Sequence, residues 1–249
     1  HNDTTDKELR GTHRDDILKG SSDDDRIIAG SGDNMVSALE GDDYVSALGG
    51  HDALWGGEGD DTVSAGGGND RIGGGAQNDK LDSGAGNDTI WGGNGRDTIM
   101  AGEGKDVIGG GAGYDRIFAK GGNDEIRGGT GNDTAFGGDG NDTVLGLSGN
   151  DELSGGNGAD LLDGGAGNDI LRGGAGADTM VFSTGADQVL DFGPGDRIDL
   201  SGVAAIDNFA ALQTHLSGSA NVVIDDGLGN TMTLIGISSG ELEANDFIF

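Results

Sequence analysis

The chain has 249 residues and a formal net charge of −31, from 45 acidic and 14 basic residues, with 55 glycines and no cysteine. This charge argues against nucleic acids and anionic membranes as partners, because both would repel it. The lack of cysteine excludes disulfides and thiolate metal sites, and no apolar run reaches the roughly 18 residues of a transmembrane segment. High charge with 33 % hydrophobic residues predicts disorder unless cations neutralise the acids.

Residues 1–10 are a polar N-terminal segment without the pattern of a secretory signal peptide. The sequence starts with His1 rather than methionine. We therefore expect this chain to be part of a longer protein.

A nine-residue period runs through residues 11–190 without insertion or deletion. Starting at Asp16, every ninth residue is aspartate except Asn34. A preference for turns alone would also allow Asn, Ser or Gly at many of these positions, so the charge itself is needed. We predict that the following aspartates are metal ligands: Asp16, Asp25, Asp43, Asp52, Asp61, Asp70, Asp79, Asp88, Asp97, Asp106, Asp115, Asp124, Asp133, Asp142, Asp151, Asp160, Asp169, Asp178 and Asp187.

The other positions of the repeat predict short strands and tight loops. An apolar residue stands two positions after each of these residues, from Leu18 to Val189, and glycine stands two positions before in seventeen of twenty repeats. Glycine supplies the positive φ of a tight loop, and the last three residues predict a very short strand with one inward side chain. One apolar residue in nine cannot close a core, so we expect coils of two repeats to share a narrow core between two parallel sheets. The frequent glycines and the missing 3.6-residue period exclude helix.

The repeat, as in Gly92–Met100 and Gly137–Leu145, resembles the nonapeptide of the RTX (repeats-in-toxin) family of secreted proteins. The resemblance implies an all-β, right-handed parallel β-roll (β-solenoid) of about ten 18-residue coils. It also implies Ca²⁺ ions between loops stacked on the same edge, bound by aspartates of two loops and by backbone carbonyls. Hard oxygen donors without cysteine or clustered histidine independently favour Ca²⁺ or Mg²⁺, and an oxygen cage that wraps around the ion suits the larger Ca²⁺.

Ten loops on each edge leave nine gaps, and hence eighteen possible sites. The first coils depart from the repeat, since Asn34 lacks the charge and other residues replace glycine at Arg14, Asp23, Leu39 and Leu48. Later departures are isolated, at Gln77, Lys120 and Leu147. We expect about 12–16 bound Ca²⁺ ions, with the weakest sites near the N-terminus.

Residues 191–249 form a C-terminal region of different composition. The sequence predicts strands on both sides of a turn at 193–195, a helix within 207–216 with Asp207 or Asn208 as its N-cap, and a hairpin over 221–235. We expect this region to close the end of the roll. It resembles the cap of serralysin-type proteases, and residues 246–249 resemble the C-terminal signal for type I secretion, although they also suit a final strand.

We find no catalytic motif in the chain. There is no His-Glu-x-x-His and no Gly-x-Ser-x-Gly with a plausible histidine partner, so the chain itself is predicted not to be an enzyme. The longer protein could be a protease, lipase or toxin. His51, beside Asp52, is interpreted as a solvated turn residue.

The leading hypothesis is a secreted or cell-surface module that folds on binding Ca²⁺. Carboxylates stacked about 4.8 Å apart repel by roughly 0.9 kcal/mol per pair even in water, so we expect an unfolded chain without Ca²⁺. The resemblance implies export by the type I machinery before folding. The alternative is a module that binds a polysaccharide or cell surface. Outward residues Met100, Phe118 and Phe136 on one face, and Trp55 and Trp91 on the other, could mark such a partner or could pack between coils.

Overall fold

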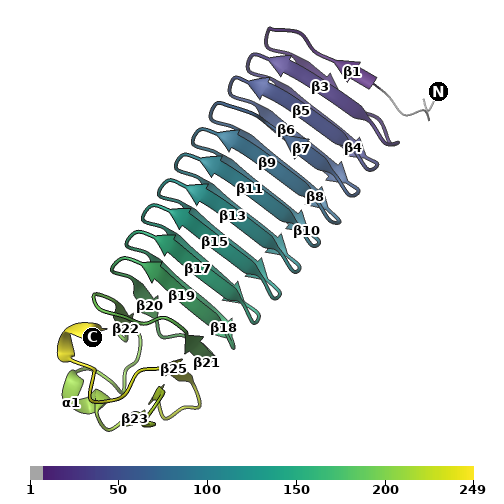
Figure 1. Cartoon of the computed structure of the whole chain (residues 1–249). Helices are drawn as coiled ribbons and strands as arrows, with labels where there is room; N and C mark the ends of the chain where they lie inside the picture. Colours follow the sequence, from purple (N-terminus) through teal and green to yellow (C-terminus); the bar gives the residue numbers. More distant parts are fainter. Residues whose placement is uncertain (1–7) are drawn as a thin grey trace.

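The structure is a computed structural model that describes residues 8–249. Residues 1–7, which include His1 and most of the polar N-terminal segment, lie outside the described residues. The coils stack one above another along one axis, and the C-terminal region lies at one end of the stack (Figure 1). No helix in the described part of the chain is long and apolar enough to cross a membrane.

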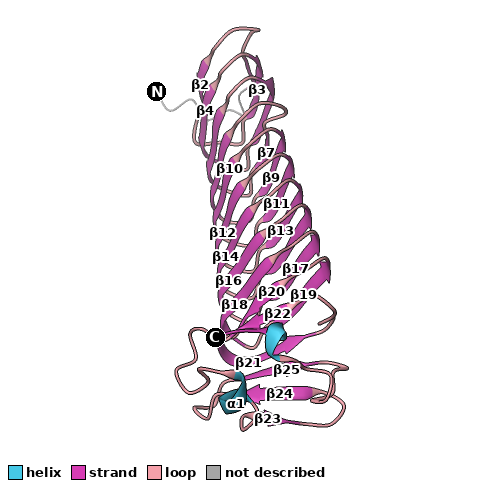
Figure 2. Cartoon of the chain, turned by 90° about the vertical axis from the view of Figure 1, so that its left-hand side faces the viewer, coloured by secondary structure: helices cyan, strands magenta, loops and turns pink. Residues whose placement is uncertain are grey.

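The roll consists of two parallel sheets joined by tight turns (Figure 2). The odd sheet contains β1 (Glu8–Arg10), β3 (Arg26–Ser31), β5 (Tyr44–Gly49), β7 (Thr62–Ser64), β9 (Lys80–Ala85), β11 (Thr98–Glu103), β13 (Arg116–Gly121), β15 (Thr134–Asp139), β17 (Glu152–Asn157), β19 (Ile170–Ala175) and β21 (Thr184–Val189). The even sheet contains β2 (Ile17–Lys19), β4 (Met35–Glu40), β6 (Ala53–Glu58), β8 (Arg71–Ala76), β10 (Thr89–Asn94), β12 (Val107–Ala112), β14 (Glu125–Thr130), β16 (Thr143–Ser148), β18 (Leu161–Gly167), β20 (Thr179–Val181) and β22 (Arg197–Asp199).

Each strand pairs in parallel with the strand one coil away, at a sequence offset of 18 residues. Ile99 of β11 pairs with Ile117 of β13, and Ile90 of β10 pairs with Ile108 of β12. The all-β parallel solenoid predicted from the nine-residue period is therefore confirmed.

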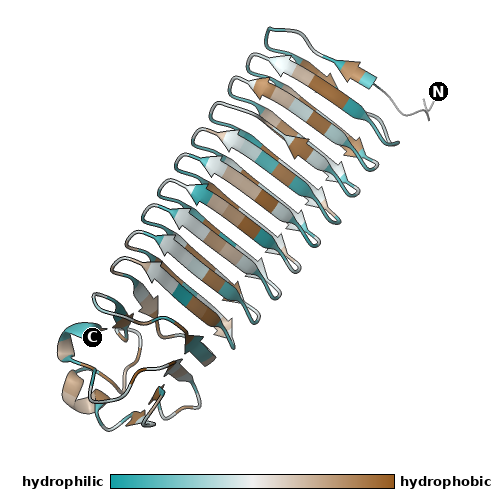
Figure 3. Cartoon of the chain, viewed as in Figure 1, coloured by the Kyte–Doolittle hydropathy of each residue, from teal (hydrophilic) through white to brown (hydrophobic). Residues whose placement is uncertain are grey.

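Most strands have six residues, whereas the repeat predicted three. In β11 the side chains of Ile99 and Ala101 are both buried, so each strand has two inward positions. The second inward residue is small throughout the middle of the roll, because a larger side chain would meet the aspartate five residues later and a carbonyl of the next coil, as at Gly92. The strand therefore continues into the glycine-rich half of the repeat. Apolar residues of neighbouring strands lie side by side and form bands across the sheet (Figure 3).

The narrow core is a stack of aliphatic side chains. The apolar residue two positions after each residue of the nine-residue series is fully buried from Ile27 to Val189, and Leu18 in the first coil is half-buried. Burial of an Ile, Leu or Val side chain contributes roughly 1.5–3 kcal/mol. Because each coil has only two such residues, the core is thin for the amount of backbone that it orders.

The C-terminal region closes the end of the roll, as expected. The odd sheet continues from β21 to β25 (Thr231–Leu234), which forms an antiparallel hairpin with β24 (Val222–Asp225), and β23 (Leu216–Ser217) follows beyond it. The even sheet ends with β26 (Phe247–Ile248), which pairs with β22 after the 3-10 helix η1 (Ala244–Asp246).

The helix predicted within 207–216 is a single turn, α1 (Phe209–Leu212), with Asn208 as its N-cap. The side chain of Asn208 accepts a hydrogen bond from the N–H of Ala211 at 2.9 Å. The helix is shorter than predicted because Leu216 lies in β23, where it pairs with Ile224 of the hairpin.

Candidate metal sites

The repeated aspartates, together with Asn34, form two columns along the turns that join the sheets; we call them the Asp ladder. One edge carries Asp16, Asn34, Asp52, Asp70, Asp88, Asp106, Asp124, Asp142, Asp160 and Asp178, and the other carries Asp25, Asp43, Asp61, Asp79, Asp97, Asp115, Asp133, Asp151, Asp169 and Asp187. Asp16 is half-buried, and each of the other predicted ligands is at most 3 % exposed. The structure thus places the predicted ligands in two continuous buried rows.

One oxygen of each ladder carboxylate has a structural hydrogen bond. Asp115 Oδ1 accepts the backbone N–H of Asp97 at 2.8 Å, and Asp133 Oδ1 accepts the N–H of Asp115 at 2.8 Å. The same bond recurs between successive coils along both edges. Each side chain is thereby aimed into the turn, and its second oxygen is held at a fixed place.

That second oxygen, Oδ2, is buried without a hydrogen-bond partner in sixteen ladder aspartates. They are Asp43, Asp52, Asp61, Asp70, Asp79, Asp88, Asp97, Asp106, Asp115, Asp124, Asp133, Asp142, Asp151, Asp160, Asp169 and Asp178. A buried carboxylate oxygen without a partner is costly. Burial accordingly raises the pKa of Asp79 to about 8 and that of Asp115 to about 7, from 3.8. Cations bound to these oxygens would remove the cost.

Backbone carbonyls complete an oxygen-rich surrounding. Asp97 Oδ2 and the carbonyl oxygen of Gly110 both border the space above the Cα of Gly92, and a Cβ there would overlap both. The described residues contain no group of three or more His, Cys, Asp or Glu side chains suited to a metal. Successive ladder aspartates on one edge lie one coil apart, so two carboxylates border each gap between aspartates, and backbone carbonyls such as that of Gly110 lie beside them. This donor set suits Ca²⁺, which takes 6–8 oxygens in flexible geometry.

The ladder contains one more aspartate than the sequence predicted, nine residues after Asp187. Asp196 Oδ1 accepts the N–H of Asp178 at 3.0 Å, its Oδ2 accepts the N–H of Gly193 at 2.8 Å, and Asp196 is 6 % exposed. Pro194 occupies the usual glycine position, which hid the repeat. The signal was present, because Asp196 is the ninth residue after Asp187 and Ile198 follows two positions later.

A second, exposed ladder at the preceding residue also escaped the sequence analysis. Asp60 Oδ1 accepts the N–H of Asn78, and Asn78 Oδ1 accepts the N–H of Arg96, both at 2.9 Å. His51 belongs to this outer ladder, since its Nδ1 accepts the N–H of Asn69 at 2.8 Å. The residue before a ladder aspartate is often Asn or Asp, as in Asn87-Asp88, and this outer ladder gives the preference a structural cause. Exposed His51 is a turn residue as interpreted.

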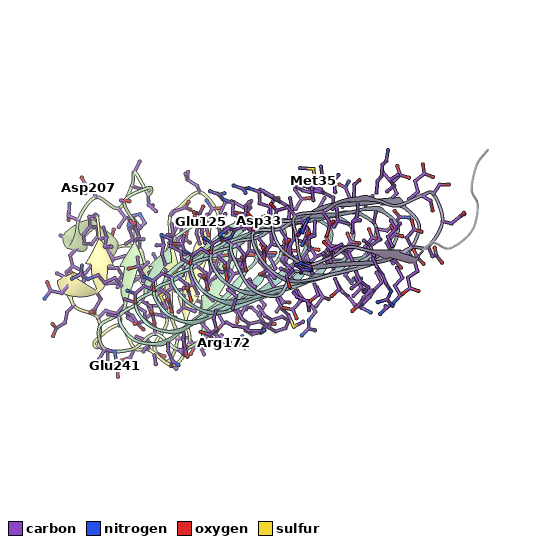
Figure 4. All side chains as sticks on the ribbon, turned by 90° about the horizontal axis from the view of Figure 1, so that it is seen from above. Asp33, Met35, Glu125, Arg172, Asp207 and Glu241 are labelled. Carbon is purple, nitrogen blue, oxygen red and sulfur yellow. The ribbon has the colours of Figure 1, made fainter. Side chains whose placement is uncertain are left out.

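The outward aromatic residues stack between coils. Phe118 and Phe136 lie with ring centroids 5.2 Å apart and an angle of 7° on the odd sheet, and Trp55 and Trp91 lie 6.2 Å apart at 16° on the even sheet. The two faces are opposite, as the outward projection of Met35 from the even sheet and of Arg172 from the odd sheet shows (Figure 4).

The model of the RTX calcium-binding nonapeptide repeat (4 copies) matches residues 10–45, 46–81, 82–117, 118–153 and 154–189. The chain belongs to this family. Its RTX repeats bind Ca²⁺, in agreement with the carboxylate and carbonyl surroundings of the ladder. No curated protein matches the chain.

The solved structures similar to this RTX chain include the following three proteins. The AlgE6R3 subunit of the Azotobacter vinelandii mannuronan C5-epimerase is 32 % identical over 48 % of this chain and 78 % of its own, with a TM-score of 0.39. The extracellular lipase LipA from Serratia marcescens is 20 % identical over 67 % of this chain and 40 % of its own, with a TM-score of 0.37. A Ca²⁺-dependent β-helical antifreeze protein from an Antarctic bacterium is 22 % identical over 76 % of this chain and 75 % of its own, with a TM-score of 0.35. The family assignment rests on the repeats and not on these similarities.

Proposed function

We propose that this chain is an extracellular Ca²⁺-binding module that is unfolded without Ca²⁺ and folds when it binds many ions. The observation that carries the proposal is the set of sixteen buried Oδ2 atoms without a partner. Ions that bind only the folded chain shift the folding equilibrium by mass action. The thin core and the many glycines leave little other free energy to order the backbone.

The size of the chain in solution tests this proposal. An unfolded chain of this length has a radius of gyration of about 55 Å, and the folded roll is far more compact. Small-angle X-ray scattering should therefore give about 55 Å in EDTA and a clearly smaller value in millimolar CaCl₂. A compact chain in EDTA would refute Ca²⁺-dependent folding.

The proposal extends to secretion through the type I machinery, with this chain as the C-terminal folding and secretion part of a larger protein. Low cytosolic Ca²⁺ would keep the chain unfolded for export, and high external Ca²⁺ would fold it. Support comes from the final residues, where Asp246 precedes three apolar residues. In the folded chain Phe247 is 6 % exposed and Phe249 is 39 % exposed, so folding covers only part of the segment.

A secretion assay can separate this part of the proposal. The chain would be produced together with a type I exporter, with and without residues 246–249, and measured in the medium and in the cells. We expect the deletion to abolish export while the cellular amount is maintained. Deletion of 238–241, an exposed turn before η1, is a control of equal length that should keep export. Equal export of both deletions and the full chain would refute the role of the terminus.

Polysaccharide binding is the second candidate, and one surface favours it. Trp55 and Trp91 are 40 % and 45 % exposed on the even sheet. The other outward residues of β4 to β12 in the same two columns carry no acid; they are Met35, Ser37, Ala53, Arg71, Gly73, Thr89, Val107 and Gly109. In a chain with 45 acids, such a face could accept a sugar polymer by ring stacking.

Calorimetry in CaCl₂ tests this candidate with mannuronan and neutral β-glucan oligomers. Binding that is lost in Trp55→Ala and Trp91→Ala, and kept in the odd-sheet control Phe136→Ala, would support it. Heats equal to those of dilution for every oligomer would refute it.

A further inference from the structure

The two ends of the Asp ladder differ from its middle. Asp16 Oδ2 accepts the backbone N–H of Thr12 at 2.6 Å and its hydroxyl at 3.0 Å. Asp25 Oδ2 accepts the N–H of Ser21 at 2.6 Å and its hydroxyl at 3.1 Å. At the other end, Asp187 Oδ2 accepts the hydroxyl of Ser183 at 3.0 Å.

These three hydroxyl residues occupy one position of the repeat, four residues before the ladder aspartate. From Gly30 to Gly174, every residue at this position except Leu48 has a positive φ, and thirteen of the seventeen are glycine. Thr12, Ser21 and Ser183 do not have a positive φ. In the end turns, therefore, a donor side chain and a different backbone path replace the glycine of the interior turns.

The remaining end positions are also unsuited to a cation. Asn34 carries no charge, and its Nδ2 donates to the carbonyl of Gly32 at 2.8 Å. Phe182 stands five residues before Asp187, where interior turns have Gly, Ala or Ser, and it is 8 % exposed. A phenyl side chain at this position leaves less room for an ion than the small residues of the interior turns do.

We propose that the hydroxyls of Thr12, Ser21 and Ser183 take the place of cations at the ends of the ladder, so that the end turns are metal-free. This inference rests on the proposed function and specifies which gaps hold Ca²⁺. The filled gaps are those between two aspartates whose Oδ2 atoms are buried without a hydrogen-bond partner. They run from Asp52 to Asp178 on one edge and from Asp43 to Asp169 on the other, seven gaps on each edge.

The physical reason is the position of the end turns. An ion at an end would have a full set of oxygens on one side only, whereas a hydroxyl satisfies the one remaining Oδ2 atom with a neutral donor. The ladder thus stops binding cations where the stacked loops stop. The assignment predicts fourteen bound Ca²⁺, from the seven filled gaps on each edge.

Native mass spectrometry of the Ca²⁺-saturated chain counts the ions directly. We expect fourteen ions for the unaltered chain, one for each gap between two Oδ2 atoms without a hydrogen-bond partner. Because each ion needs both flanking aspartates, Asp151→Asn should lose two ions, Asp169→Asn one and Asp187→Asn none. A count above fourteen, or the loss of an ion in Asp187→Asn, would overturn the proposal.

The hydroxyl role has a separate test. Ser183→Ala should lower the melting temperature of the Ca²⁺-loaded chain, because Asp187 Oδ2 loses its hydroxyl donor. The ion count should stay unchanged, because the proposal places no ion at this turn. Thr184→Ala is the matched control, since the hydroxyl of Thr184 donates to the carbonyl of Gly165 and not to the ladder. A lost ion in Ser183→Ala would make the hydroxyl a ligand and contradict the inference.

The outcomes distinguish this inference from the proposed function. A chain that folds in EDTA and binds no Ca²⁺ refutes Ca²⁺-dependent folding itself. A chain that folds only with Ca²⁺, but carries ions in the end turns, refutes only the metal-free ends.

Discussion

Asp115→Asn changes the ladder at its centre while keeping its shape. Asp115 is 1 % exposed, and its Oδ1 accepts the N–H of Asp97 at 2.8 Å. Asparagine retains this acceptor. Asn34 shows that the ladder accommodates an amide, since its Oδ1 accepts the N–H of Asp16 at 3.1 Å and its Nδ2 donates to Gly32. We therefore expect the variant to keep the fold.

Two effects of opposite sign follow from the lost charge. Burial raises the pKa of Asp115 to about 7 from 3.8, and a shift of about three pKa units corresponds to roughly 4 kcal/mol. Above neutral pH, asparagine removes this cost from the metal-free fold. The gaps on both sides of residue 115 each lose one carboxylate, so the Ca²⁺-loaded chain should carry two ions fewer and need more Ca²⁺ to saturate.

Native mass spectrometry and a Ca²⁺ titration followed by ellipticity measure both effects. The matched control is Asp60→Asn, which removes the same charge from the exposed outer ladder, where Asp60 Oδ1 accepts the N–H of Asn78. The control should bind as many ions as the unaltered chain. The reasoning fails if Asp115→Asn binds the full number of ions, or if the control loses as many.

Three further predictions concern protons, backbone strain and the core. Burial raises the pKa of Asp79 to about 8 and of Asp151 to about 7, so the metal-free fold binds more protons than the unfolded chain, and its stability falls as the pH rises through this range. In EDTA, acidification from pH 8 to pH 4 should therefore increase the β signal in circular dichroism; an unchanged signal would contradict this. Leu147 has a φ of 78°, so Leu147→Gly should raise the melting temperature of the Ca²⁺-loaded chain, through about 1 kcal/mol of relieved strain. Gly138→Ala should lower the melting temperature, because φ is 114° and a Cβ would overlap the carbonyl of Lys120. If both variants melt at the temperature of the unaltered chain, backbone strain at these positions is contradicted. Ile117 is fully buried, and Ile117→Ala should cost about 2–5 kcal/mol in chemical denaturation with Ca²⁺, whereas a loss below 1 kcal/mol would show a core looser than described.

The period of the sequence predicts the coils, the two edges and the buried aspartates, because each repeat makes the same contacts with the repeat one coil away. Ile99 pairs with Ile117 for the same reason that Asp97 bonds to Asp115. The strand length was underestimated, since pairing between coils continues through backbone atoms of glycines such as Gly102, which have no side-chain pattern to reveal it.

The ends of the ladder were harder to predict than its middle. Ser183 and Asp196 keep the nine-residue period, but Ser183 and Pro194 stand where glycine is usual, so the glycine pattern did not reveal their contacts with the ladder. The short helix at Phe209–Leu212 was overestimated, because pairing of Leu216 with Ile224 outweighs the helical spacing of the apolar residues. Departures from a repeat are decided by tertiary contacts, which the period does not encode.

Far-UV circular dichroism of the full chain in EDTA, in millimolar MgCl₂ and in millimolar CaCl₂ tests the central claim most directly. The buried carboxylates without partners predict a disordered spectrum in EDTA and in MgCl₂, and a cooperative change to a β spectrum on addition of CaCl₂. A β spectrum of full amplitude in EDTA at neutral pH would contradict the account, since the ladder would then be stable without the cations assigned to it.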